Sequence, residues 1–197
     1  MEETLQPKRF PPPQVVEGSW AYYDIIQPLC DLRYGTGYMT REVYARWMEH
    51  PDMIQIALVD GQFAGYSSMM PVTLNEVVEK MKVNRSDAER IAGGLPVLYY
   101  KSTVVPFEYE GRGHFQALAH AAIRTARGLG YGSMFSTAWT YGGYTPLARP
   151  FARLGFQHLY RRSMLWYEDK SYTCIVCKGP CKCDAEIYYK TLRGEQP

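Results

Sequence analysis

Residues 97–127 constrain the fold of this chain more than any other segment. They begin with a β-branched and aromatic run, pass through a turn that contains Gly111 and Gly113, and end in a helical pattern. The glycines let the backbone approach a ligand closely, and the free N–H groups of a first helical turn favour an anion. The segment therefore predicts an anion site, although a ligand-free turn between strand and helix fits a bare Gly-x-Gly equally well.

The helical part of this segment is amphipathic. Its apolar residues fall on one face and its polar residues on the other, and Gly128 and Gly130 predict its end. The spacing excludes two well-known phosphate loops, because the chain has no Gly-x-x-x-x-Gly-Lys and no Gly-x-Gly-x-x-Gly with a downstream acidic residue. The apolar face comprises Phe115, Leu118, Ala119, Ala122, Ile123 and Ala126.

Two motifs resemble the GNAT superfamily of N-acyltransferases. Residues 105–115 (VPFEYEGRGHF) are similar to its acyl-CoA loop, Gln/Arg-x-x-Gly-x-Gly/Ala, and residues 151–156 (FARLGF) are similar to its second marker, Tyr-x-x-x-Gly-Phe. The chain departs from the first motif at Glu110 and at Phe115. Glu110 places a negative charge near the expected pyrophosphate, which leaves open an acyl carrier protein as the donor in place of coenzyme A.

The resemblance covers nearly the whole chain and implies its architecture. We expect one acyltransferase domain over residues 1–197, of class α/β (α+β), with a mixed, mostly antiparallel central sheet, a splayed parallel strand pair and flanking helices. Two segments are additional: a helical insertion at 72–95 and a cysteine-rich loop at 171–184. Capping-box patterns at Thr73-x-x-Glu76 and Ser86-x-x-Glu89 predict two short helices in the insertion.

Local patterns predict the remaining elements. Pro28 is expected to kink or end the first helix early, and Asp60-Gly61 is typical of a two-residue hairpin turn. The proline-rich arm at residues 7–13 is not helical in this interpretation. We expect a strand starting at Val15, helices at 19–33, 40–49 and 145–154, a hairpin over 54–70, a strand at 132–138, a long strand at 155–169 and a final strand at 184–192.

The resemblance also implies how the donor is held. Backbone groups of Thr103, Val104 and Val105 would hold the pantetheine arm and polarise the thioester carbonyl. The Arg112 side chain either contacts phosphate or lies in solvent. Two helices would flank the acceptor pocket, so Tyr34, Tyr38 and Trp47 are either acceptor contacts or packing residues. The pyrophosphate would be bound by the amides of Glu110, Gly111, Arg112, Gly113, His114 and Phe115.

The implied reaction transfers acetyl from acetyl-CoA to a primary amine of a small molecule or amino-acid-like acceptor. The amine must lose a proton, and the leaving thiolate benefits from a proton donor. The family's acidic tyrosine is replaced by Phe151, so Tyr144 or Tyr141 in the preceding loop is the candidate donor. Packing tyrosines and an unassisted or water-assisted thiolate are the alternatives. Glu108, His114 or a water chain would accept the amine proton.

Four of the five cysteines lie within ten residues: Cys174, Cys177, Cys181 and Cys183. Four thiolates suit a tetrahedral zinc site, and in a cytosolic chain metal is favoured over disulfides. Free thiols, a labile disulfide and an iron–sulfur cluster are the alternatives. A third functional hypothesis is a catalytically silent GNAT-like module that binds a partner through this loop, and Phe151 supports it.

Composition narrows the other possibilities. A chain of 197 residues with 46% hydrophobic content suits one core. The net charge of +2 has no concentrated basic run, which argues against nucleic-acid binding. There is no apolar run of 18 residues, and the acidic start at Glu2 and Glu3 does not resemble a signal peptide. We therefore expect no membrane association and a cytoplasmic protein, and the sequence leaves the oligomeric state open, with a homodimer as one possibility.

Overall fold

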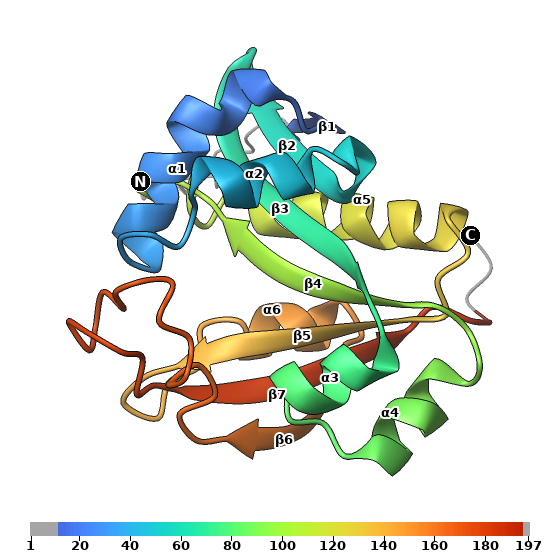
Figure 1. The fold of residues 1–197 in the computed structure, drawn as a ribbon. Helices are drawn as coiled ribbons and strands as arrows, with labels where there is room; N and C mark the ends of the chain where they lie inside the picture. Colours follow the sequence, from blue (N-terminus) through green and yellow to red (C-terminus); the bar gives the residue numbers. More distant parts are fainter. Residues whose placement is uncertain (1–11, 195–197) are drawn as a thin grey trace, which may run out of the picture.

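A seven-stranded sheet forms the centre of the structure, a computed structural model that describes residues 12–194 (Figure 1). The strand order is β1-β2-β3-β4-β5-β7-β6. β4 and β5 pair in parallel and every other neighbouring pair is antiparallel, which confirms the predicted mixed sheet. The strands are β1 (Gln14–Glu17), β2 (Ile54–Val59), β3 (Gln62–Val72), β4 (Val97–Val104), β5 (Ser133–Thr140), β6 (Gln157–Arg162) and β7 (Asp184–Thr191).

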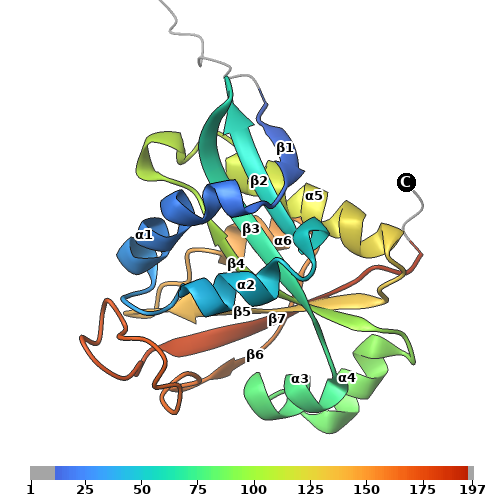
Figure 2. The same ribbon diagram turned by 45° about the horizontal axis from the view of Figure 1, so that its top comes forward.

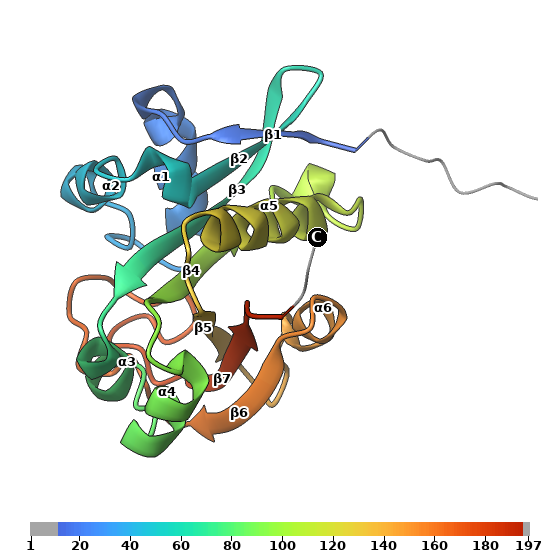
Figure 3. The ribbon, with the colours of Figure 1, turned by 90° about the vertical axis from the view of Figure 1, so that its right-hand side faces the viewer.

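Helices cover both faces of this sheet (Figure 3). One face carries α1 (Tyr23–Arg33), α2 (Arg41–Trp47), α3 (Leu74–Lys80) and α4 (Arg85–Ala92), and the other carries α5 (His114–Gly128) and α6 (Ala148–Arg153). Short 3-10 turns span Trp20–Tyr22 (η1), Pro51–Met53 (η2) and Phe107–Tyr109 (η3). No helix within residues 12–194 has the length and apolarity needed to cross a bilayer.

The predicted strand, turn and amphipathic helix of residues 97–127 are confirmed as β4, η3 and α5. The predicted apolar face of α5 packs on the sheet, with Leu118, Ala119 and Ala122 almost fully buried, while His120 and Arg124 are exposed. Because small alanines face the sheet, α5 can lie close to the strands and hold the preceding turn at the end of β4.

The two predicted capping boxes have different outcomes. At the start of α3, the Glu76 N–H donates to Thr73 Oγ1 at 3.1 Å and the Thr73 N–H donates to the Glu76 carboxylate at 2.9 Å. The second box is wrong, because α4 already begins at Arg85 after Asn84, so Ser86 lies inside the helix. The Asn84 N–H donates to the Tyr160 hydroxyl of β6 at 2.6 Å. A tertiary contact therefore fixes this helix start.

The predicted long strand at 155–169 is also wrong. β6 ends at Arg162, and Met164 has φ +50°, a left-handed conformation that cannot continue a strand. The Asp184 carboxylate accepts hydrogen bonds from Arg161 Nε at 2.9 Å and from the Met164 N–H at 3.4 Å, which turns the chain away from the sheet edge. Residues 163–183 then form a long loop before β7.

Two N-terminal predictions concern prolines. Pro28 lies inside α1 and does not end it, whereas the chain changes from a 3-10 turn to an α-helix at Tyr23. The expectation for the proline-rich arm falls mostly outside the described residues, because its first five positions, 7–11, precede residue 12.

Candidate active site

The two parallel strands separate in the middle of the sheet. Pairing between β4 and β5 runs from Val97 with Ser133 to Tyr100 with Ser136 and stops there, although both strands continue. On the other side of β4, the register with β3 skips Lys101, which is the additional residue of a β-bulge. Bulges redirect side chains and are common beside active sites. The predicted splayed pair is therefore present.

A cavity of about 1090 Å³ lies at this separation. Its walls come from the ends of β4 and β5, from α1 and α2, from the loop after β6, and from the turn before α5. Of the nine residues predicted to hold the donor, the following line the cavity: Thr103, Val104, Val105, Glu110, Gly111 and Phe115.

The donor loop, residues 110–115, is open on its outer side. Gly111 and Gly113 have φ +72° and +85°, and a Cβ added at either position would meet no atom within 4 Å. Gly113 precedes the 15-residue helix α5 without a side-chain cap. First-turn N–H groups left without such a cap are suited to an anionic ligand. The loop therefore has room for an anionic group at the start of α5.

Arg33, at the end of α1, compensates the unexpected negative charge of Glu110. Its guanidinium forms an ion pair with the Glu110 carboxylate and donates to the Val105 carbonyl at 3.0 Å. It also lies 3.6 Å from the centroid of the Phe107 ring. Sequence reasoning missed Arg33 because 77 residues separate it from Glu110, and only the packing of α1 against β4 brings the two together.

Phe115 and Phe151 form an apolar wall. Their ring centroids lie 6.2 Å apart, and both residues line the cavity. Phe151 is buried against Phe156 and Tyr188, with centroid distances of 4.7 and 5.1 Å. Phe151 thus contributes packing at the position where the family motif has its acidic tyrosine, and it has no proton to donate.

The predicted proton-transfer residues do not line the cavity. Tyr141 and Tyr144 are 60% and 69% exposed, and their backbones pair with each other in the loop after β5. Glu108 is exposed on η3. His114 is buried, stacked on Tyr109 at 5.4 Å, and its Nδ1 lies 3.3 Å from the Arg112 carbonyl oxygen. Their catalytic roles stay predictions.

Two other polar groups of β4 do reach the cavity. The Tyr99 hydroxyl lies 2.5 Å from Thr137 Oγ1 and so bridges β4 and β5 just beyond their last paired residues. Lys101 lies at the bulge, where burial and the nearby Arg46 lower the pKa of its ammonium group. Its signal in the sequence is a single charge within the apolar run VLYYKSTVV.

An aromatic cluster forms the wall opposite β5. Tyr34, Tyr38 and Trp47 all line the cavity, and all three also pack in the core cluster of α1, α2 and the sheet, so both interpretations stay open. The Tyr34 and Tyr38 ring centroids are 4.3 Å apart, and the Tyr34 hydroxyl donates to the Thr103 carbonyl at 3.3 Å. Lys101 Nζ lies 5.8 Å from the Tyr38 ring and 5.7 Å from the Trp47 ring. This wall therefore combines aromatic surface with one half-buried lysine.

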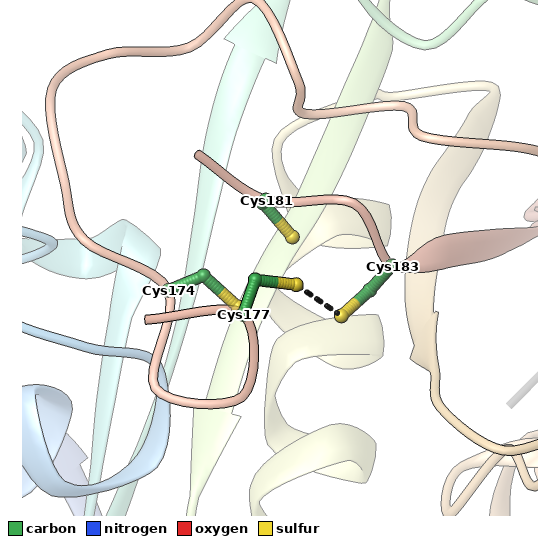
Figure 4. Close-up of side chains that lie close together, drawn as sticks. All are labelled: Cys174, Cys177, Cys181 and Cys183. Atoms are coloured by element: carbon green, nitrogen blue, oxygen red, sulfur yellow. Dashed lines mark hydrogen bonds between the residues drawn. The ribbon is translucent and has the colours of Figure 1, made fainter. Parts of the chain in front are cut away.

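The four clustered cysteines bring their sulfur atoms together (Figure 4). All four Sγ atoms lie within 4.8 Å of one another, and those of Cys177 and Cys183 are 3.5 Å apart. Four thiolates at about 2.3 Å from a tetrahedral zinc ion would be about 3.8 Å apart. The Lys182 N–H donates to the Cys177 sulfur at 3.2 Å, a contact that stabilises a thiolate. The donor set therefore fits one metal ion.

Comparison with known proteins identifies the fold. No family model matches the sequence, and no curated protein does. NAA60 of Arabidopsis thaliana, bound to a bisubstrate analogue, matches with a TM-score of 0.68 and 13% identity over 93% of this chain and 99% of that chain. Ard1 of Thermoplasma volcanium gives 0.64 and 13% over 91% and 97%. Arylalkylamine N-acetyltransferase 2 of Aedes aegypti gives 0.63 and 16% over 92% and 99%. The chain therefore has the GNAT fold.

Proposed function

We propose that this protein is an acetyl-CoA-dependent N-acyltransferase that acts on a primary amine of a small-molecule or amino-acid-like acceptor. The observation that carries the proposal is a single cavity that joins the donor loop, the separation of β4 and β5, and the aromatic wall. Donor and acceptor can therefore meet at the bulge of β4. The solved structures of similar fold support the same chemistry, since they include arylalkylamine and agmatine N-acetyltransferases.

Donor binding would use the loop and the strand that follow from the sequence motif. The amides of Gly111 to Phe115 would bind the diphosphate, and the backbone of Thr103 to Val105 would hold the pantetheine arm. The charge of Glu110 was the reason to consider an acyl carrier protein as donor. Because Arg33 compensates that charge, coenzyme A is the donor that we propose.

In the chemical step, the neutral amine nitrogen attacks the thioester carbonyl. The new C–N bond forms as the C–S bond breaks, and the amine gives up a proton while coenzyme A leaves as a thiolate. We assign the proton acceptor to Lys101, because it lies at the bulge, lines the cavity, and has an ammonium group whose pKa burial lowers. Protonation of the thiolate would fall to Tyr141, Tyr144 or water.

Calorimetry and a turnover assay test this assignment. We expect acetyl-CoA and coenzyme A to bind the purified protein with one site, and a panel of primary amines to release free thiol from acetyl-CoA. Lys101→Met should lower kcat at least tenfold and leave acetyl-CoA affinity within about twofold. Failure to bind coenzyme A would overturn the donor assignment, and binding without turnover over the panel would favour the silent module.

We further propose that Cys174, Cys177, Cys181 and Cys183 bind one zinc ion. The compact sulfur cluster supports this, and reduced cysteines suit a reducing compartment such as the cytoplasm. Elemental analysis should give one zinc per chain, and Cys177→Ser should lose it, with Cys30→Ser as the cysteine control. Iron in the elemental analysis together with a visible absorption band would indicate an iron–sulfur cluster instead. A disulfide in the native protein would exclude the zinc site.

A further inference from the structure

The cysteine loop, residues 171–184, lies along the turn between α1 and α2, as Figures 1 and 2 both show. We call residues 34–38 the acceptor turn. The Thr173 N–H donates to the Thr36 carbonyl at 2.9 Å, and the Ile175 N–H donates to the Tyr34 carbonyl at 3.1 Å. These are backbone contacts between segments more than 130 residues apart in sequence. The loop is therefore docked on the acceptor turn by main-chain hydrogen bonds.

Two glycines make this close approach possible. A Cβ at Gly35 would lie 1.8 Å from the Thr173 carbonyl oxygen, and one at Gly37 would lie 2.8 Å from that of Ser171. Both glycines have positive φ, +125° and +90°. The neighbouring atoms are backbone atoms, which cannot move aside unless the whole loop moves. The sequence Gly35-Thr36-Gly37 is thus shaped for contact with the cysteine loop.

Aromatic contacts continue this connection to β4. The Tyr172 ring packs edge-on against Tyr38, with centroids 5.7 Å apart and planes at 89°. Tyr38 in turn stacks on Tyr34, whose hydroxyl donates to the Thr103 carbonyl. A continuous set of contacts therefore runs from the cysteine loop to the strand that would hold the pantetheine arm.

The cysteine loop also forms part of the cavity wall. Tyr172, Cys174, Ile175 and Cys181 line the cavity together with the donor loop. The cysteine cluster packs against Trp139 and Trp166, which line the cavity as well. Residues 163–183 contain no helix or strand, and the backbone hydrogen bonds within the cysteine loop are local ones, such as those that join Cys174 to Lys178 and Gly179. A bound metal ion would add cross-links between the two ends of this loop, which carry Cys174 with Cys177 and Cys181 with Cys183.

We propose that the metal held by the four cysteines is a structural part of the acceptor site. It keeps the cysteine loop docked on the acceptor turn, so its removal opens the acceptor side of the cavity. The donor loop is held by α5, whose apolar face packs in a core cluster that contains no residue of the cysteine loop. Metal removal should therefore weaken acceptor binding far more than donor binding. The kinetic part rests on the proposed acyltransferase function, and the docking part rests on the proposed zinc site.

The experiment compares the full-length zinc protein with the same protein after treatment with a chelator and a reductant. Hydrogen–deuterium exchange is measured on peptides covering the acceptor turn, the cysteine loop and, as an internal reference, α5. We expect protection to fall in the first two and to persist in α5. The acceptor KM should rise at least tenfold, while acetyl-CoA affinity by calorimetry changes less than about twofold. Restored zinc should reverse both changes.

A second variant separates docking from metal binding. Gly35→Ala leaves all four cysteines in place, so it should retain zinc and yet lose protection in the acceptor turn and show the raised acceptor KM. Gly61→Ala, in the remote β2–β3 turn, is the matched control because its added Cβ would meet no atom within 4 Å. Unchanged protection in the metal-free protein would overturn the proposal, as would equal losses of donor and acceptor binding. Absent turnover would contradict only the proposed function, since exchange still reports docking.

Discussion

Two of the Gly-x-Gly segments in this chain look alike in sequence and have opposite surroundings. Gly111 and Gly113 in the donor loop and Gly35 and Gly37 in the acceptor turn all have positive φ. Beyond the donor glycines there is open space, whereas beyond the other pair lies the backbone of the cysteine loop. One turn leaves room for a ligand and the other is already filled by the protein itself.

This difference shows that a Gly-x-Gly pattern indicates close approach to the backbone, and that it does not distinguish a ligand from another segment of the protein. In the donor loop, the missing side chains leave the amides of α5 accessible to an anion. In the acceptor turn, they admit the carbonyls of Ser171 and Thr173. The distinction depends on which distant segment the fold places next to the turn.

The largest expected effect on stability comes from adding a side chain at Gly35, in the turn that the cysteine loop already fills. Gly35→Ala would place a methyl group on a backbone carbonyl and a non-glycine residue at φ +125°. A strained residue of this kind costs about 1–3 kcal/mol, which corresponds to a fall of about 2–12 °C in Tm for a domain of this size. Thermal unfolding of the zinc-loaded protein measures it. A Tm equal to that of Gly61→Ala would show that the docked geometry is absent in solution.

A side chain added in the donor loop should have a different effect, on ligand binding as well as on stability. Gly111→Ala and Gly61→Ala have nearly equal φ, +72° and +75°, and open space around the added methyl group. Both should therefore lose about 1–2 kcal/mol of stability. Only Gly111→Ala should also weaken acetyl-CoA binding, by about tenfold or 1.4 kcal/mol. Calorimetry checks this, and equal acetyl-CoA affinities in the two variants would remove the donor loop from the binding site.

A smaller effect tests the charge balance of the donor loop. Arg33→Met leaves the Glu110 carboxylate uncompensated beside the bound diphosphate, so acetyl-CoA affinity should fall about threefold to tenfold, the 0.7–1.4 kcal/mol range of a partly exposed charge pair. The double variant Arg33→Met with Glu110→Gln should recover to within about twofold of the wild type. Calorimetry at two salt concentrations measures both, and a double variant as weak as the single one would contradict this compensation.

The smallest effect concerns the two capping-box patterns. They also look alike in sequence, and only one of them forms its cap in the structure. Thr73→Ala removes a cap that forms and should cost about 0.5–2 kcal/mol of unfolding free energy. Ser86→Ala removes one that does not form and should change it by less than about 0.5 kcal/mol. Urea unfolding distinguishes them, and equal losses would mean that α4 starts at Ser86 in solution.

The Thr73 cap should also depend on pH. Hydrogen bonds from Lys80 and from Thr73 lower the pKa of the Glu76 carboxyl to about 2 from its ordinary value of 4.5. A carboxyl whose pKa is lower in the folded state stabilises the protein above the unfolded value and loses that contribution as it is protonated. The stability advantage of wild type over Glu76→Gln, which has no carboxyl to ionise, should therefore narrow as the pH falls from about 4.5 towards 2.

Sequence patterns predicted most elements because their signals are local. The apolar spacing in α5, the Asp60-Gly61 turn and the strand at β4 needed no partner segment to be identified. The errors fall where a distant residue decides the outcome. Asp184 ends β6 early, and Tyr160 moves the start of α4 to Arg85. For the site, six of the nine residues that the motif predicts to hold the donor line the cavity, whereas Tyr141 and Tyr144 lie on the surface.

The sequence by itself determined the strand, turn and helix of residues 97–127 and the close spacing of four cysteines, since both depend on neighbours along the chain. Only the tertiary structure decided that Arg33 pairs with Glu110, that Lys101 occupies a bulge at the strand separation, and that the cysteine loop fills Gly35. The physical reason is that charge compensation, desolvation and close backbone packing depend on what lies next to a residue in space. Sequence spacing does not carry that information.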